Sequence, residues 1–256
     1  MDRRQMMAGS IAAAAALALP AAAETKREAK VPARNIVLVH GLFADGSCWS
    51  DVIGRLQTSG LNVTAVQNPL TSLDAAADAV RRVLARTDGP TVLAGHSFAG
   101  TIISEVGGAP NVSALVYIAA RAPDADEDYA ALVKQFASAP ATAGIIFDGD
   151  EGRLSEDAFL HDFAGDVPDA RARILYATQQ PFRKMLTQAK TTNAAWRMKP
   201  TYYAVSEADR TIDPDLQRFM AKRMDGHTIS LGASHLSLIS QAAKVADLIE
   251  LAARGA

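Results

Sequence analysis

The sequence contains a single cysteine, Cys48, so no disulfide can form within the chain. No basic stretch is interleaved with aromatic residues and the formal net charge is −2, which argues against a nucleic-acid partner. The histidines are scattered and show no metal-ligand spacing; they are His40, His96, His161, His227 and His235. We therefore expect no metal and no cofactor, and a small molecule as the partner.

The sequence also lacks an apolar run that is long enough to span a membrane comfortably. Its start carries Arg3 and Arg4, then an alanine-rich apolar segment at 6–19 and small residues at 21–23. This order is typical of a signal peptide. We predict that residues 1–23 are removed and that the mature protein is exported to the periplasm or beyond, with no membrane attachment; the pattern does not choose between the Sec and Tat routes.

A glycine-rich turn in 91–103 has no lysine closely after its last glycine, which excludes a phosphate-binding loop. A short apolar run enters this turn and a helical pattern leaves it. Gly95 and Ala99 lie two residues to either side of Ser97, and Gly100 follows, which approximates the G-x-S-x-G nucleophile elbow. Ala99 departs from the strict motif. The alternative is a strand and a turn that contain a serine by chance.

The hydrophobic pattern alternates between strands and helices along 256 residues, which is enough for one sizeable core. Apolar runs of strand length predict strands at 35–39, 61–66, 92–94, 113–119, 201–205 and 227–231. Helical spacing predicts helices between them and a closing helix at 236–253. This order is typical of an α/β fold with a mostly parallel sheet, whose site lies at the carboxyl ends of the strands.

The pattern changes between residues 124 and 199, where helical patches surround one short apolar run at 144–147. We predict a helical lid over 124–199, inserted into a core formed by 34–123 and 200–256. The lid offers several apolar side chains to a pocket, among them Phe136, Phe159, Phe163 and Trp196.

A serine hydroxyl needs a general base before it becomes a useful nucleophile, and the base needs an acid to orient it. In a fold with this elbow, the acid and the histidine follow the serine along the chain. Of the histidines after Ser97, His235 lies in the loop between the last strand and the last helix, at the catalytic edge. His227 begins a strand at the opposite edge and His161 lies in the lid. We therefore predict His235 as the base.

The acid is sought directly after the penultimate strand, in S-E-A-D-R-T-I-D at 206–213. We choose Asp209 and keep Glu207, Asp213 and Asp124 as alternatives, since any of these can be a turn or capping residue.

The backbone N–H after the nucleophile, that of Phe98, is one expected oxyanion donor, and a second comes from the loop after the first strand. We expect Leu42 to supply the second. His40 and Gly41 support this loop, His40 by hydrogen bonding.

Four motifs, V-L-V-H-G-L-F, A-G-H-S-F-A-G, S-E-A-D-R-T-I and A-S-H-L-S-L-I-S, together resemble the α/β-hydrolase superfamily. More narrowly, they resemble the small esterases and hydroxynitrile lyases related to plant methyl-ester esterases, and their bacterial homologues. The likeness covers about residues 34–252. It implies Ser97, Asp209 and His235 as a catalytic triad, Leu42 and Phe98 as oxyanion donors, and about six strands without a leading antiparallel hairpin.

The resemblance implies a serine hydrolase of small to medium carboxylic esters. A hydroxynitrile lyase of this branch is expected to carry a lysine just before the acid and a threonine beside the oxyanion loop. Those places hold Ala208 and Leu42-Phe43 here, which disfavours lyase chemistry. A ligand receptor without catalysis is the third hypothesis, and the complete triad argues against it.

Overall fold

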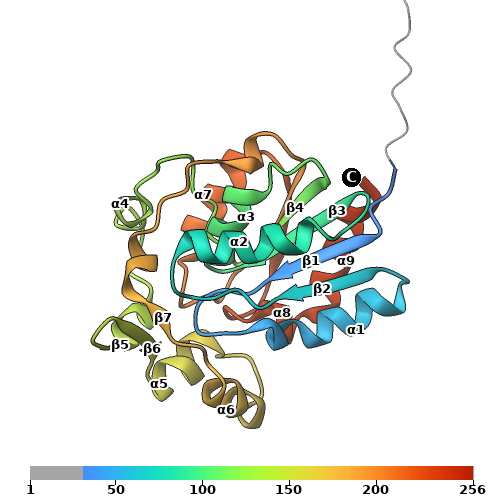
Figure 1. The fold of residues 1–256 in the computed structure, drawn as a ribbon. Helices are drawn as coiled ribbons and strands as arrows, with labels where there is room; N and C mark the ends of the chain where they lie inside the picture. Colours follow the sequence, from blue (N-terminus) through green and yellow to red (C-terminus); the bar gives the residue numbers. More distant parts are fainter. Residues whose placement is uncertain (1–30, 256) are drawn as a thin grey trace, which may run out of the picture.

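The computed structural model describes residues 31–255, so the predicted signal peptide lies outside the described residues. Its main sheet has six strands in the order β2-β1-β3-β4-β8-β9, and every neighbouring pair is parallel. The strands are β1 (Asn35–Val39), β2 (Asn62–Val66), β3 (Thr91–His96), β4 (Val112–Ile118), β8 (Thr201–Ser206) and β9 (His227–Leu231). The predicted α/β fold with about six parallel strands is confirmed (Figure 1).

The central strands are apolar on both faces because helices cover the sheet on both sides. Strand β3 is buried along its whole length, whereas the edge strands β2 and β9 are exposed or half-buried except at their last residues. The strand order shows that the chain first adds β2 on one side of β1 and then crosses back to add β3 on the other side. The carboxyl ends of β1 and β3 therefore border the position where ligands bind in open α/β sheets.

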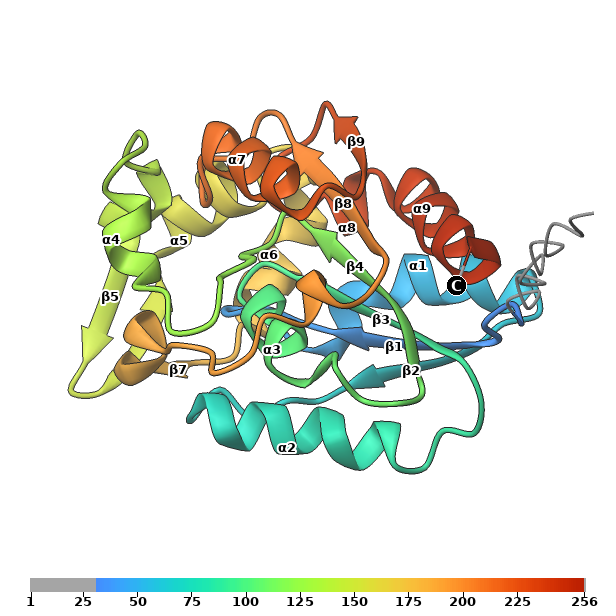
Figure 2. The same ribbon diagram turned by 90° about the horizontal axis from the view of Figure 1, so that it is seen from above.

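Helices form a layer on each face of the sheet (Figures 1 and 2). On one face α1 (Ser50–Thr58), α8 (Ser237–Ser240) and α9 (Ala242–Gly255) contact one another. The other face carries α2 (Leu73–Leu84), α3 (Ala99–Val106) and α7 (Pro214–Met224), as right-handed crossovers require. The predicted closing helix at 236–253 is thus two helices, separated at Gln241.

None of the helices within residues 31–255 is both long enough and apolar enough to cross a membrane. The longest, α9, has 14 residues, which is short of the roughly 20 that a span needs.

Residues 129–183 lie beyond the carboxyl ends of the main strands and are not wholly helical (Figure 2), whereas residues 195–199 return to pack beside α3 and the start of β4. Three helices, α4 (Tyr129–Val133), α5 (Glu156–Ala158) and α6 (Asp169–Ala177), accompany an antiparallel sheet of β5 (Ile145–Asp148), β6 (Glu151–Leu154) and β7 (Phe182–Arg183). The expectation of a helical lid was wrong in this respect.

The β5–β6 hairpin explains why the lid was mispredicted. It closes over Gly149 and Asp150, and Gly149 adopts φ +58°, a left-handed conformation that glycine accepts without strain. Most residues of both strands are exposed or half-buried. The apolar run at 144–147 corresponds to β5, but β6 shows no such run, so the sequence did not indicate a hairpin.

Candidate active site

Ser97 lies at a tight turn between the end of β3 and the start of α3, with φ +57°. A non-glycine residue in this region is strained, and such strain is typical of functional positions. The turn requires small neighbours: a Cβ on Gly95 would lie 2.9 Å from the Ala99 carbonyl oxygen, and one on Gly100 would overlap the Arg121 carbonyl oxygen. The Ala99 methyl is fully buried, so the departure from the strict motif is accommodated.

Three side chains that are far apart in the sequence form one hydrogen-bonded chain. The Nε2 of His235 lies 2.8 Å from the Oγ of Ser97, and its Nδ1 lies 2.7 Å from the Oδ2 of Asp209. The side chains of His235 and Asp209 are fully buried. In this arrangement Nδ1–H donates to the carboxylate and leaves Nε2 free to accept the serine proton, the geometry of a nucleophile, base and orienting acid.

The Asp209 carboxylate is held by more than the histidine. Its Oδ1 accepts from the backbone N–H groups of Thr211 at 2.7 Å and Ile212 at 3.0 Å, and its Oδ2 accepts from Nε2 of Gln217 at 2.7 Å. Gln217 is fully buried on α7 and its Oε1 accepts from the Ser206 N–H at 3.0 Å. Sequence reasoning missed Gln217, although a polar residue on the buried stripe of a helix is a signal that could have revealed it.

The three alternative acids have other partners. Glu207 forms an ion pair with an arginine of α7, and Asp213 caps the N-terminus of that helix. Asp124 pairs with the guanidinium of Arg197, whose hydrogen bond lowers the pKa of that carboxyl. Of the four candidates, Asp209 is the one that contacts His235 in the described chain.

The remaining histidines lie outside the hydrogen-bonded chain. His161 is exposed on the lid beside Asp157, and His227 begins the edge strand β9. His96, directly before the serine, is fully buried and donates from Nε2 to the carbonyl oxygen of His235 at 3.0 Å. Burial, first of all, holds the pKa of His96 well below its usual value, so this ring supports the base loop as a neutral group. No motif in the sequence points to this role of His96.

The loop after β1 is fixed by hydrogen bonds of His40, as expected. Its Nδ1 donates to the Gly41 carbonyl oxygen at 2.9 Å, and its Nε2 accepts from the Asn68 N–H at 3.3 Å. Burial lowers the pKa of His40, which favours the neutral tautomer that makes both bonds. Neither the Leu42 nor the Phe98 amide donates to another group among residues 31–255, so both predicted oxyanion donors are available to a ligand.

Glycine is required at position 41 because the loop passes directly against Ser97. An added Cβ would lie 2.6 Å from the Ser97 Cβ and 2.9 Å from the His96 carbonyl oxygen. We expect Gly41→Ala to lower the free energy of unfolding by about 1–3 kcal/mol, as overpacking does. Gly54→Ala is the matched control. Its Cβ would meet nothing within 4 Å in the middle of α1, so a stabilisation of about 0.5–1 kcal/mol is expected. Urea unfolding measures the free energy of unfolding of both variants. Equal changes in the two variants would contradict the close approach of Gly41 to Ser97.

A cleft of about 520 Å³, counted out to its open mouth, lies over Ser97. It is framed by the oxyanion loop, by the lid and by the loop after β8. Its lining residues are Leu42, Phe43, Ser97, Arg121, Ala141, Thr142, Ile145, Leu154, Phe182, Thr187, Thr211 and Ile212.

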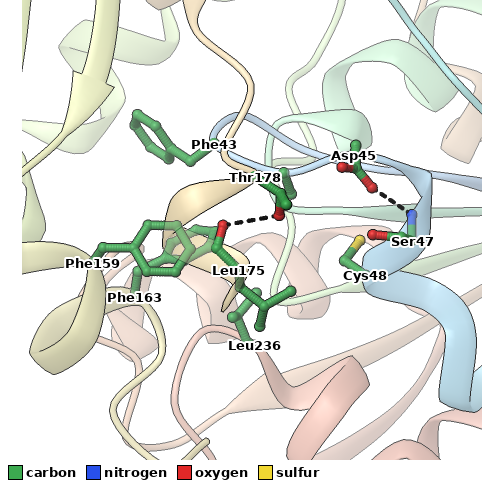
Figure 3. Close-up of a pocket in the computed structure, with 10 residues that line it drawn as sticks. Phe43, Asp45, Ser47, Cys48, Phe159, Phe163, Leu175, Thr178 and Leu236 are labelled. Atoms are coloured by element: carbon green, nitrogen blue, oxygen red, sulfur yellow. Dashed lines mark hydrogen bonds between the residues drawn. The ribbon is translucent and has the colours of Figure 1, made fainter. Parts of the chain in front are cut away.

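Phe43 lines both this cleft and a smaller cavity of about 240 Å³ that is drawn in Figure 3. Lid residues Phe159 and Phe163 face the segment with Cys48 across that cavity. Phe163 also packs on the ring of His235, with centroids 5.1 Å apart. Burial raises the pKa of the Cys48 thiol, which leaves it in the unreactive protonated form. Of the other lid aromatics in the prediction, Phe136 and Trp196 line neither space.

The fold and the elbow define a class of α/β proteins with a serine at a strained turn above a parallel sheet. The sequence model of the Alpha/beta hydrolase family matches residues 36–248, and the chain therefore belongs to this family. The predicted resemblance to the α/β-hydrolase superfamily is confirmed.

Individual relatives agree with this assignment. A pyrethroid hydrolase of Sphingobium wenxiniae is 27% identical over 244 residues, which cover 84% of this chain and 86% of the relative. Among solved structures, polyneuridine aldehyde esterase superposes with a TM-score of 0.74 at 16% identity, covering 85% of this chain and 98% of that one. A pyrethroid hydrolase from Sphingobium faniae JZ-2 superposes with a TM-score of 0.72 at 21% identity, covering 86% and 97%.

Proposed function

We propose that this protein hydrolyses small to medium carboxylic esters through an acyl-enzyme on Ser97. The observation that carries the proposal is the continuous hydrogen-bonded chain from Asp209 through His235 to Ser97. The names of the relatives, a pyrethroid hydrolase and an esterase, support the same reaction class.

In the first half of the reaction Ser97 Oγ attacks the ester carbonyl carbon while His235 Nε2 accepts the hydroxyl proton. The oxyanion that forms takes hydrogen bonds from the Leu42 and Phe98 amides. Collapse of the tetrahedral intermediate breaks the bond to the alcohol, which leaves with the proton from His235. Water then attacks the acyl-enzyme with His235 again as base, and the acid is released as Ser97 recovers its proton.

A panel of chromogenic esters graded in acyl length tests this function on the mature protein. We expect turnover of at least one ester, with a burst of alcohol product stoichiometric with enzyme wherever deacylation is the slower step. The length of acyl chain that gives the highest kcat/KM then reports how the cleft and lid select the substrate.

Lyase and receptor functions remain the alternatives, and the same panel separates them. Release of cyanide and a carbonyl compound from a cyanohydrin, with no ester turnover, would favour a lyase. Binding of a ligand that is unchanged by Ser97→Ala, with no turnover of ester, thioester or cyanohydrin, would favour a receptor. Ala208 and Leu42-Phe43 stand where the lyase branch is expected to have lysine and threonine, and this difference favours the esterase.

We further propose that the protein acts after export. Arg3, Arg4 and the apolar segment at 6–19 carry this proposal. N-terminal sequencing of protein recovered from the periplasm of a bacterial host is expected to begin near Glu24. Recovery of the intact chain beginning at Met1 would contradict removal of the segment.

A further inference from the structure

Arg121 is the one charged residue that lines the cleft over Ser97 in the described structure. The cleft lining otherwise consists of apolar side chains and hydroxyl groups, and it contains no aspartate or glutamate. Arg121 follows β4 at the carboxyl edge of the sheet, and its backbone N–H donates to the carbonyl oxygen of Ser97 at 3.0 Å. The backbone of residue 121 is thus tied to that of Ser97.

The Arg121 guanidinium has aromatic neighbours but no acceptor. Its Cζ lies 5.2 Å from the centroid of the Phe98 ring and 4.7 Å from that of the Tyr129 ring. Within residues 31–255 its nitrogen atoms donate no hydrogen bond and form no ion pair. These contacts with aromatic rings use none of the N–H donors of the guanidinium as hydrogen bonds, so the donors are free to bind an acceptor.

Arg223, which is also partly buried, differs from Arg121 because its guanidinium has acceptors. Arg223 donates to Glu127 and to the Ala122 carbonyl oxygen. An unpaired cation that is withdrawn from water is costly, so buried charges are normally paired. Burial lowers the pKa of Arg121, yet an arginine stays protonated at neutral pH. The hydroxyl of Tyr129 is also buried without a partner in the described chain.

We propose that Arg121 binds an anionic group of the substrate, and that the preferred substrates are esters that carry a carboxylate a short distance from the scissile bond. The ester fits the cleft with its carbonyl at Ser97 and its carboxylate at the guanidinium, where a planar, bidentate pair can form. This inference rests on the proposed ester hydrolysis and specifies its substrate class. Phe98 and Tyr129 hold the guanidinium in place by cation–π contacts.

Two pairs of esters test this proposal, one for each side of the scissile bond. Monomethyl glutarate is compared with methyl valerate, and acetoxyacetate with propyl acetate, each by acid release at constant pH. In at least one pair we expect kcat/KM of the charged ester to exceed that of the neutral one by about 10- to 100-fold, the range for a hydrogen bond to a charged group. Arg121→Met is expected to bring this ratio to 1 or below, and Arg121→Lys to an intermediate value.

Arg197→Met is the matched control, because Arg197 also stacks on an aromatic ring, that of Trp196 at 4.5 Å, but lies outside the cleft. In Arg197→Met, the turnover and the ratio of kcat/KM between charged and neutral ester are expected to equal those of the wild type. Circular dichroism and thermal melting confirm that each variant is folded. The proposal is overturned if the wild type hydrolyses the charged ester of both pairs no better than the neutral one, and this outcome does not require that Arg121→Met folds. It is also overturned if Arg121→Met leaves the ratio of kcat/KM between charged and neutral ester unchanged.

Binding of glutarate, followed by isothermal titration calorimetry, gives a readout that does not depend on turnover. We expect glutarate to bind the wild type and Arg197→Met equally, and Arg121→Met at least about 10-fold more weakly. If no ester is hydrolysed but glutarate binding depends on Arg121, the esterase proposal fails and the anion site stands. If neutral esters are hydrolysed and glutarate does not bind, the esterase stands and the anion site fails.

Discussion

Replacement of Ser97 by alanine is expected to lower kcat by about 10⁵- to 10⁶-fold, the range found when a serine nucleophile is removed from a triad. The hydroxyl is the atom that forms the acyl-enzyme, and neither His235 nor Asp209 has another function once it is gone. The burst of alcohol product should disappear as well. The measurement is stopped-flow hydrolysis of the best chromogenic ester of the panel.

Ser97→Ala removes one oxygen and keeps the cleft, so the binding of a non-hydrolysable ligand should persist. Ser59→Ala is a suitable control, since this exposed serine donates to Glu250 on the opposite side of the fold from the lid. It should leave kcat unchanged. Retention of a tenth or more of the wild-type rate by Ser97→Ala, with the same burst, would place the nucleophile elsewhere.

The parts of the site that lie next to regular strands were predictable from the sequence. Strand β1 begins and ends at the predicted residues, 35–39, because a run of β-branched and apolar residues fits a strand buried on both faces. The elbow at Ser97 was predictable because a strained turn admits only small neighbours, and small residues are visible in the sequence. His235 followed from its place in the last loop at the same edge of the sheet.

The roles and partners of the supporting residues were not predictable, even where a buried polar residue is visible in the pattern, because they depend on what the fold brings close to them. Gln217 lies on a helix whose pattern shows only one buried face, and nothing in the sequence indicates that this face meets Asp209. His96 was overlooked because its partner is a backbone carbonyl 139 residues away. Arg121 has no motif around it. Its position in the cleft comes from the turn after β4, and its lack of a carboxylate partner is a property of the assembled structure.

The second large effect is expected for Asp209→Asn, which should lower kcat by about 10⁴-fold and leave the fold intact. An asparagine that accepts from the Thr211 and Ile212 amides through its oxygen must point its NH₂ group at Gln217 and His235. That group cannot accept the Nδ1–H of His235. The imidazole then favours the tautomer that carries its proton on Nε2, which cannot take the proton of Ser97.

The same substitution at Asp213 and Asp124 shows whether kcat depends on the carboxylate that orients His235 or on the loss of any negative charge. Asp213→Asn keeps a good helix cap, and Asp124→Asn removes a partly exposed ion pair with Arg197, so both should retain kcat within about twofold because neither carboxylate contacts the histidine. Kinetics on the same ester, with urea unfolding of each variant, provide the comparison. A large loss in Asp124→Asn with normal turnover in Asp209→Asn would assign the acid to the end of β4. The 2.7 Å contact between Asp209 Oδ2 and His235 Nδ1 would then orient the ring without being needed for catalysis.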